Sequence, residues 1–259
     1  MLNYFNRHDK KAALQMHAKS SRIVFSLSQG NALSYTPADF PLIHDATGAL
    51  CACCPKEMKF SPIKVDFLSG RYAGRLARHH SLDEPLAKAI GLTPHAALTV
   101  IDATAGFGRE GMLLALLGCS VIMIEQSPIM AALLKDGLLR AKADSAFSAL
   151  LTQEIECIEG RAQEWIGSLT SSRHIDAIYL DPMFPLRTKT AAVKKEMQFL
   201  HAVVGNQSGE DDDLFAAALA SGVSRVVVKR PANAKPLGDK APDYSVSGGQ
   251  MRFDVYRRE

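Results

Sequence analysis

The sequence has no long apolar run and no secretory leader pattern. Its longest uncharged stretch, residues 111–124, is shorter than the roughly 18 residues that a membrane-spanning helix needs, and Gly118 divides it. Residues 1–11 are too polar for a signal peptide. We therefore expect a cytoplasmic protein without a membrane segment.

Cysteine is also scarce. The chain has 5 cysteines, an odd number, and Cys51, Cys53 and Cys54 cluster near His44. A second pair of ligands at zinc-binding spacing is missing, so reduced thiols are favoured over a metal centre. We predict no metal site.

The excess of positive charge is small. A net charge of +3 and a pI of about 8.6 are compatible with a nucleic-acid partner but do not require one. The 259 residues, 47% of them hydrophobic, suffice for one large α/β domain with an extension. We predict a monomer with an α+β extension at residues 1–95, a candidate for substrate contact, and a main domain at 96–259.

The main domain is predicted to begin with a strand, a glycine turn and a helix. Val100 and Ile101 are typical of a buried strand, and the apolar run 112–117 of a buried helix. Gly106 and Gly108 between them let the backbone approach a ligand, next to the free N–H groups of a helix start. Asp102 stands at the carboxyl end of the strand, where open α/β sheets bind ligands.

Two classes of cofactor bind at such a strand–glycine turn–helix segment. Gly106-x-Gly108-x-x-Gly111 formally matches the dinucleotide fingerprint, which would indicate an NAD-dependent oxidoreductase. However, Asp102 would then face phosphates. S-Adenosylmethionine has a cationic sulfonium and an amino group and lacks phosphate, so it suits an acidic residue before the glycines. We predict this cofactor, with contacts from Asp102, Gly106 and Gly108.

Strands and helices then alternate, which predicts a parallel sheet. The expected strands are 121–124, 154–159 (an edge strand), 175–181 and 225–231. The expected helices are 128–142, a turn around Trp165, 191–204 and 213–221. The segments 243–247 and 252–256 predict a hairpin. Five parallel strands closed by this hairpin form a Rossmann-like seven-stranded sheet, the class I methyltransferase plan. In the extension, 23–27 and 63–67 are predicted strands, and 84–90 a helix with Asp83 as N-cap.

The second informative motif is Asp181-Pro-Met-Phe-Pro185, directly after a predicted strand. It resembles the (Asp/Asn)-Pro-Pro-(Tyr/Phe) motif of enzymes that methylate planar NH₂ groups. Hydrogen bonds from the amine to the Asp181 carboxylate and the Pro182 carbonyl would localise the lone pair on nitrogen. Phe184 would stack a flipped base. We predict Asp181, Pro182 and Phe184 as catalytic; the alternative is a loop cap and a core aromatic.

Further contacts follow from position along the chain. Glu125 ends a strand and would accept the ribose hydroxyls. Arg161 and Ala162 follow the next strand and would flank the adenine, whereas Arg109 and Glu110 open the first helix, where Glu110 could hold the cofactor's amino group. For each, an ordinary surface carboxylate or helix start is the alternative.

Basic residues are predicted to surround the same rim and to bind RNA or DNA phosphates. They are Arg187, Lys189, Lys194, Lys195, Lys229 and Arg230.

Several strings together resemble the bacterial ribosomal RNA small subunit methyltransferase J family. They are Asp102-Ala-Thr-Ala-Gly-Phe-Gly-Arg-Glu110, Ala131-Ala-Leu-Leu-Lys-Asp-Gly-Leu138, Tyr179-Leu-Asp-Pro-Met-Phe-Pro185, Val193-Lys-Lys-Glu-Met197, Arg225-Val-Val-Val-Lys-Arg-Pro231 and Arg252-Phe-Asp-Val-Tyr256. The resemblance, from about residue 63 onward, implies methyl transfer from S-adenosylmethionine to N2 of a guanine near the 3′ end of 16S ribosomal RNA.

Carried over residue by residue, the resemblance implies cofactor contacts at Arg109, Glu110, Glu125, Gln126, Arg161, Ala162 and Asp181. The chain departs from the family at three of these places. Glu110 stands where an aspartate is usual, Gln126 where an arginine is usual, and Arg161-Ala162 where small hydroxyl residues are usual. The remaining rivals are amino-methylation of another RNA, DNA adenine or a protein glutamine, and a non-catalytic RNA-binding protein.

Overall fold

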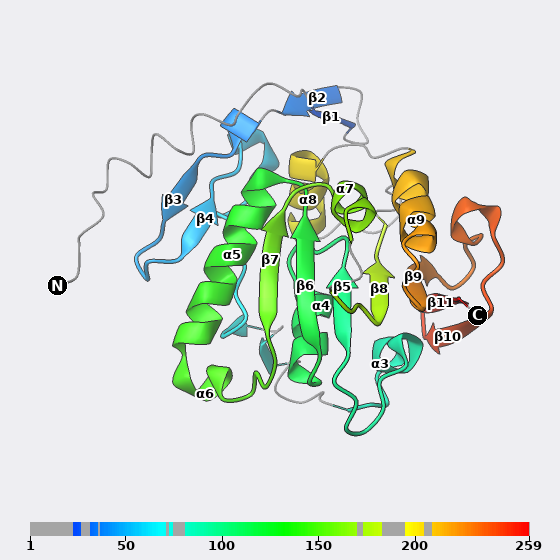
Figure 1. Cartoon of the computed structure of the whole chain (residues 1–259). Coiled ribbons are helices and arrows are strands. Elements are labelled where there is room, and N and C mark those ends of the chain that lie inside the picture. Colours follow the sequence, from blue (N-terminus) through cyan, green and yellow to red (C-terminus); the bar gives the residue numbers. More distant parts are fainter. Residues whose placement is uncertain are drawn as a thin grey trace.

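The computed structural model describes residues 23–26, 32–35, 37–70, 73–74, 81–169, 173–182, 195–204 and 209–258. Within them, seven strands form one sheet in the order β10-β11-β9-β8-β5-β6-β7 (Figure 1). The strands are β5 (Thr99–Asp102), β6 (Ser120–Glu125), β7 (Ile155–Glu159), β8 (Ala177–Leu180), β9 (Arg225–Pro231), β10 (Tyr244–Gly248) and β11 (Met251–Arg257). The strands from β5 to β9 are parallel, and β11 runs antiparallel to both of its neighbours, β9 and β10. The predicted fold class is confirmed.

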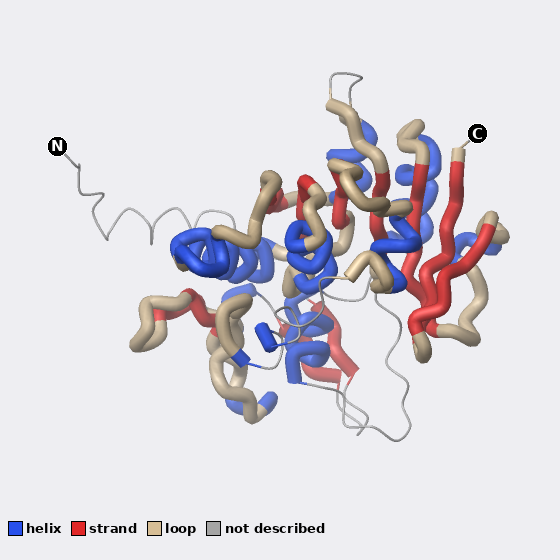
Figure 2. The backbone as a smooth tube through the Cα atoms, turned by 90° about the horizontal axis from the view of Figure 1, so that it is seen from below, coloured by secondary structure: helices blue, strands red, loops and turns tan. Residues whose placement is uncertain are grey.

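Helices cover both faces of the sheet (Figure 2). They are α3 (Pro85–Ile90), α4 (Arg109–Leu116), α5 (Pro128–Ala143), α6 (Ser145–Ser148), α7 (Ala162–Gly167), α8 (Lys195–Val204) and α9 (Glu210–Ala220). Buried side chains of α3, α4, α5 and α8 share one core with Val100, Tyr179 and Val227. Those of α7 and α9 share the other with Ile101 and Ile178. Alternate residues of each central strand therefore face opposite cores, which explains their continuous apolar runs.

The start of α5 and the edge position of β7 agree with the sequence prediction, and each has a clear local cause. The Ser127 hydroxyl accepts a hydrogen bond from the backbone N–H of Met130, and Pro128 occupies the first turn of α5. β7 lies at the edge of the sheet, as its polar–apolar alternation predicts.

Other local predictions were wrong. Residues 63–67 form no strand but a single bridge between Ile63 and Ala52. Val65 and Phe67 are buried against the main core, so their alternation reflects packing without a partner strand. Asp83 does not cap α3, because the N-cap is Glu84; Asp83 pairs with Lys88 at 3.0 Å instead.

The remaining extension consists of short elements. They are β1 (Ile23–Ser26) paired with β2 (Ala32–Tyr35), β3 (Leu42–His44) paired with β4 (Leu50–Ala52), and the 3-10 turns η1 (Pro37–Asp39) and η2 (Lys56–Met58); a third turn, η3 (Leu237–Asp239), precedes β10. Among the helices of the described ranges, none is both long and apolar enough to cross a membrane. Those ranges also hold no cluster of three or more His, Cys, Asp or Glu residues placed to bind a metal ion.

Candidate active site

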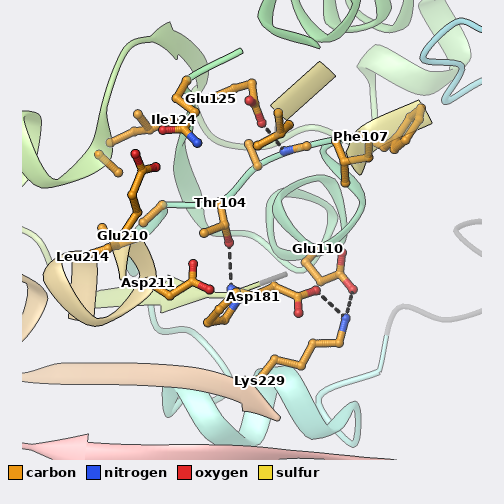
Figure 3. Close-up of a pocket in the computed structure, with 18 of the residues that line it drawn as sticks. Thr104, Phe107, Glu110, Ile124, Glu125, Asp181, Glu210, Asp211, Leu214 and Lys229 are labelled. Carbon is orange, nitrogen blue, oxygen red and sulfur yellow. Dashed lines mark hydrogen bonds and ion pairs between the residues drawn. The ribbon is translucent and has the colours of Figure 1, made fainter. Parts of the chain in front are cut away.

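A cavity of about 520 Å³ lies at the carboxyl ends of β5, β6, β8 and β9. Its wall combines the loop from Ala103 to Phe107, the ends of β6 and β8, the first turns of α4, α7 and α9, and one face of α8 (Figure 3). Parallel strands β5 and β8 are neighbours here although β6 and β7 intervene in the chain. This is a topological switch point, the usual binding crevice of such sheets.

The glycine turn is anchored to both neighbouring strands. The N–H of Ala103 donates to the Tyr179 carbonyl at 2.9 Å, and the N–H of Ala105 donates to the Ile124 carbonyl at 3.1 Å. Gly106 has a φ of 50°, a left-handed conformation that glycine adopts without strain. The turn therefore has a fixed position on the cavity wall.

Glu125 holds this turn from the side of β6. Its Oε2 accepts the N–H of Gly106 at 2.8 Å (Figure 3). Its Oε1 accepts the N–H of Ser127 at 2.7 Å. Burial raises the pKa of Glu125, while the N–H donors of Ser127, Gly106 and Gln126 oppose that rise. Glu125 thus has a structural role in addition to the ligand contact that its position predicts.

Most predicted cofactor residues line this one cavity. They are Gly106, Arg109, Glu110, Glu125, Gln126, Ala162 and Asp181. The structure does not place Asp102, Gly108 and Arg161 among the lining residues.

Each of these three residues has another place. Asp102 is 1% exposed, accepts the N–H of Thr104 at 3.2 Å, and has its pKa raised to about 8 by burial and by the charge of Glu110. Gly108 is the N-cap of α4 and packs against the core. The Arg161 guanidinium lies 3.5 Å from carboxylate oxygens of both Glu164 and Glu210.

Asp181 and Pro182 line the cavity directly after β8, as the motif predicts. The N–H of Asp181 donates to the Thr104 hydroxyl at 2.7 Å, which ties the end of β8 to the loop after β5. Burial raises the pKa of Asp181 to about 6, although the adjacent Lys229 ammonium opposes that rise. The carboxyl group is therefore still mostly ionised at neutral pH.

Lys229 lies inside the cavity wall, not on the predicted phosphate-binding rim. Its ammonium donates to Asp181 Oδ2 at 2.8 Å and to Glu110 Oε1 at 2.7 Å, and its side chain is 18% exposed (Figure 3). The Arg230 guanidinium donates to the Lys235 carbonyl, and Lys195 is exposed at the start of α8. Phe184, Arg187, Lys189 and Lys194 lie outside the described residues.

Sequence reasoning missed several residues of the wall. Thr104 positions Asp181, and Glu210 and Asp211 line the cavity from α9 (Figure 3). Burial and the neighbouring Asp212 raise the pKa of Asp211 to about 6. The only available signal was the acidic run at 210–213, which is typical of any helix start. His201, on the cavity face of α8, gave no sequence signal.

The composition of the wall suits a cationic ligand that also carries an apolar ring. The carboxylates of Glu110, Asp181, Glu210 and Asp211 outnumber the cationic groups of Lys229 and Arg109. Apolar side chains of Ile124 and Leu214 line the same space. S-Adenosylmethionine fits this donor set, because its ammonium and sulfonium would offset the acidic charge and its adenine would contact the apolar wall. Glu125 stands where a carboxylate can accept ribose hydroxyls.

The sheet order, the glycine turn and the acidic cavity define a class I S-adenosylmethionine-dependent methyltransferase. Residues 28–258 match the model of a family described as "Putative SAM-dependent methyltransferase". A relative from Thioalkalivibrio sulfidiphilus, named ribosomal RNA small subunit methyltransferase J, is 45% identical over 75% of this chain and 76% of its own length. A relative of the same name from Coxiella burnetii is 41% identical over 86% of this chain and 82% of its own length. The crystal structure of an S-adenosylmethionine-dependent methyltransferase from Neisseria gonorrhoeae is similar at 35% identity and a TM-score of 0.63, over 81% of this chain and 79% of that one.

This chain belongs to the ribosomal RNA small subunit methyltransferase J family. The family resemblance, the fold class and the predicted cofactor are confirmed, and a nicotinamide-dependent oxidoreductase is excluded.

Proposed function

We propose that this protein transfers the methyl group of S-adenosylmethionine to the exocyclic N2 of a guanine near the 3′ end of 16S ribosomal RNA. The names of its relatives support ribosomal RNA of the small subunit as the substrate. The observation that carries the proposal is the Asp181 carboxylate, which lies on the cavity wall beside the Gly106 turn. The carboxylate that would accept hydrogen bonds from the substrate amine and the residues of the cofactor site thereby line the same cavity.

The chemistry requires a more nucleophilic nitrogen. The guanine amine is conjugated with its ring, so its lone pair is delocalised. The Asp181 carboxylate and the Pro182 carbonyl would accept hydrogen bonds from its two N–H groups and so localise the lone pair on nitrogen. S-Adenosylmethionine bound in this cavity would supply an electrophilic methyl group, whose bond to sulfur would break as the nitrogen that Asp181 orients bonds to it. The product ammonium is a strong acid and loses one proton to water or to Asp181.

Substrate binding completes the proposal. Phe184 would stack on the flipped base, and Arg187, Lys189, Lys194, Lys195 and Arg230 would contact phosphates. Residues 1–95 would add contacts to the RNA as a separate extension. We place the protein in the cytoplasm, where its substrate is made, and propose that it acts as a monomer.

The test compares Asp181→Ala with the wild-type protein on small-subunit RNA from cells that lack this gene. We expect Asp181→Ala to bind S-adenosylmethionine within about threefold of wild type and to methylate RNA at least ~100-fold more slowly. Asp213→Asn, an exposed acid on α9, is the matched control. The methylated nucleoside is identified by mass spectrometry.

Two outcomes would contradict the proposal. Full activity of Asp181→Ala would remove the role of the carboxylate. Methylation of adenine or of a protein glutamine, without N2-methylguanine, would assign the same fold to another amine substrate.

A further inference from the structure

Lys229 is a buried cation held between two carboxylates from different elements. It comes from β9, whereas Asp181 follows β8 and Glu110 belongs to the first turn of α4. Its backbone pairs with Phe253 of β11, so the strand that carries it is internal to the sheet. Both contacts are shorter than 3 Å, at 2.7 and 2.8 Å. The ammonium therefore has a fixed position beside one oxygen of Asp181.

We propose that Lys229 is a positioning residue for the transfer step, which keeps the Asp181 carboxylate ionised and oriented toward the amine, while Glu110 holds Lys229 in place. The inference rests on the proposed function, because it assigns Asp181 the role of amine acceptor. It removes Lys229 from the residues that bind RNA phosphate.

The geometry of the acceptor supports this role. Lys229 contacts Oδ2, and Oδ1 makes no hydrogen bond within the part of the chain that the structure describes. The backbone N–H of Asp181 is fixed by Thr104 at 2.7 Å. Backbone and one carboxylate oxygen are thus both restrained, so the second oxygen is presented in a defined direction. Such restraint is what alignment of an amine with a methyl donor requires.

The electrostatic surroundings explain why a cation is needed. Acidic or phenolic groups from four elements face Asp181, as does the ammonium of Lys229; the four groups are Asp102 of β5, Glu110 of α4, Tyr179 of β8 and Asp211 of α9. Negative neighbours and burial both favour the protonated carboxyl. Protonated Asp181 would be a poorer acceptor for an amine N–H. Lys229 opposes both effects. The carboxylates of Asp181 and Glu110 keep the pKa of Lys229 above its usual value, although burial would lower it.

Opposite substitutions at the two partners of the ammonium provide the test. In Lys229→Met the pKa of Asp181 should rise, because the opposing cation is gone. In Glu110→Gln it should fall, because a negative neighbour is gone. We measure the pH dependence of kcat at saturating cofactor and RNA. The acidic limb, where kcat falls as Asp181 becomes protonated, should move up by at least about one pH unit in Lys229→Met. At a fixed pH below the limb this shift is a tenfold loss of kcat. In Glu110→Gln the limb should move down.

Matched variants separate positioning from folding. Lys229→Arg keeps the charge and should leave the acidic limb close to that of wild type. Lys88→Met removes an exposed lysine on α3 that pairs with Asp83 and does not line the cavity, so it should change neither kcat nor the acidic limb. The KM for the cofactor should stay within about threefold in Lys229→Met, since the effect is on the acceptor.

A measurement without turnover tests the coupling of Lys229 to Asp181 separately from the proposed function. Carboxyl-selective ¹³C NMR of aspartate-labelled protein, with Asp181→Asn for assignment, gives the titration of Asp181 in each variant. Opposite displacements in Lys229→Met and Glu110→Gln support the coupling. An Asp181 titration and an acidic limb that stay unchanged in Lys229→Met would overturn it, even if Asp181→Ala loses activity. Absence of RNA methylation by the wild type would reject the proposed function, and the NMR titration would still decide the coupling.

Discussion

Gly106 and Gly108 share the left-handed backbone but differ in the space around them. A Cβ at Gly106 would meet Leu200 at 3.6 Å, an ordinary contact. A Cβ at Gly108 would lie 2.5 Å from a methyl carbon of Leu134, which is fully buried, and 3.3 Å from Met123 and Phe67. The first glycine is required mainly for its φ of 50°, the second for its φ of 69° and for close packing of α4.

Alanine substitution at the two positions should therefore differ in cost. Gly106→Ala should lower the free energy of unfolding by about 1 kcal/mol through backbone strain. Gly108→Ala should lower it by about 3 kcal/mol, because overpacking adds to the same strain. Urea denaturation of the cofactor-free protein measures both. Equal losses would mean that packing around Gly108 relaxes freely.

At the scale of elements, Glu125 joins three of them. It ends β6, receives the N–H of the Gly106 turn and receives the N–H of Ser127 at the start of α5. The Glu125 side chain therefore sets the distance between the Gly106 turn and the start of α5. The affinity for a ligand that lies between this turn and α5 therefore depends on the distance that Glu125 sets.

Glu125→Gln should weaken cofactor binding more than it weakens the fold. Glutamine has one acceptor oxygen, so one of the two backbone N–H donors would face an NH₂ group. We expect the Kd for S-adenosylmethionine to rise at least ~10-fold, the equivalent of about 1.4 kcal/mol. Glu154→Gln, an exposed position just before β7, is the control. Isothermal titration calorimetry that gives the same Kd for both would reject this role.

The elements from residue 99 onward could be predicted from sequence because local signals there agree. Ser127 and Pro128 mark a helix start, and β-branched runs mark buried strands. Residues 63–67 carried a strand-like alternation, but the main core rather than a partner strand buries Val65 and Phe67. Helix α9 begins at Glu210 rather than Asp213, and Gly209 in a left-handed conformation is its N-cap.

The site was predictable in its residue types but not in its pairings. Asp181 and Glu125 were found because each follows a predicted strand, and both line the cavity. Lys229 was assigned to the rim because a lysine near a basic neighbour resembles a phosphate contact. Its partners are 48 and 119 residues away in the chain, so only the sheet order brings them together. Long-range pairing of this kind leaves no local pattern.

At the scale of the whole molecule, folding gathers acidic groups at one end of the sheet. Asp102, Asp181 and Asp211 all have a pKa above that of a free aspartate, to about 8, 6 and 6, and burial is the largest cause in each. The folded protein thus binds these protons more tightly than the unfolded chain does. Their contribution to stability is full below about pH 4, the unfolded pKa, and is lost as pH rises through each folded pKa.

Asp102 should dominate the upper part of this window. Asp181 and Asp211 lose their contributions by about pH 6 to 7, whereas Asp102 continues to about pH 8. Asp102→Asn keeps an oxygen for the Thr104 N–H and has no charge to bury. Relative to their difference at pH 5, the variant should gain on wild type by at most about 4 kcal/mol at pH 8.

Urea unfolding of the cofactor-free protein at pH 5, 6.5 and 8 measures this difference. Wild type should lose stability between pH 6.5 and 8, and Asp102→Asn should lose much less over the same interval. Glu154→Gln, an exposed acid, should follow wild type at every pH. Parallel curves for Asp102→Asn and wild type would show that Asp102 is ionised in the folded protein at neutral pH. In that case a compensating cation, and not protonation, would stabilise the buried end of β5.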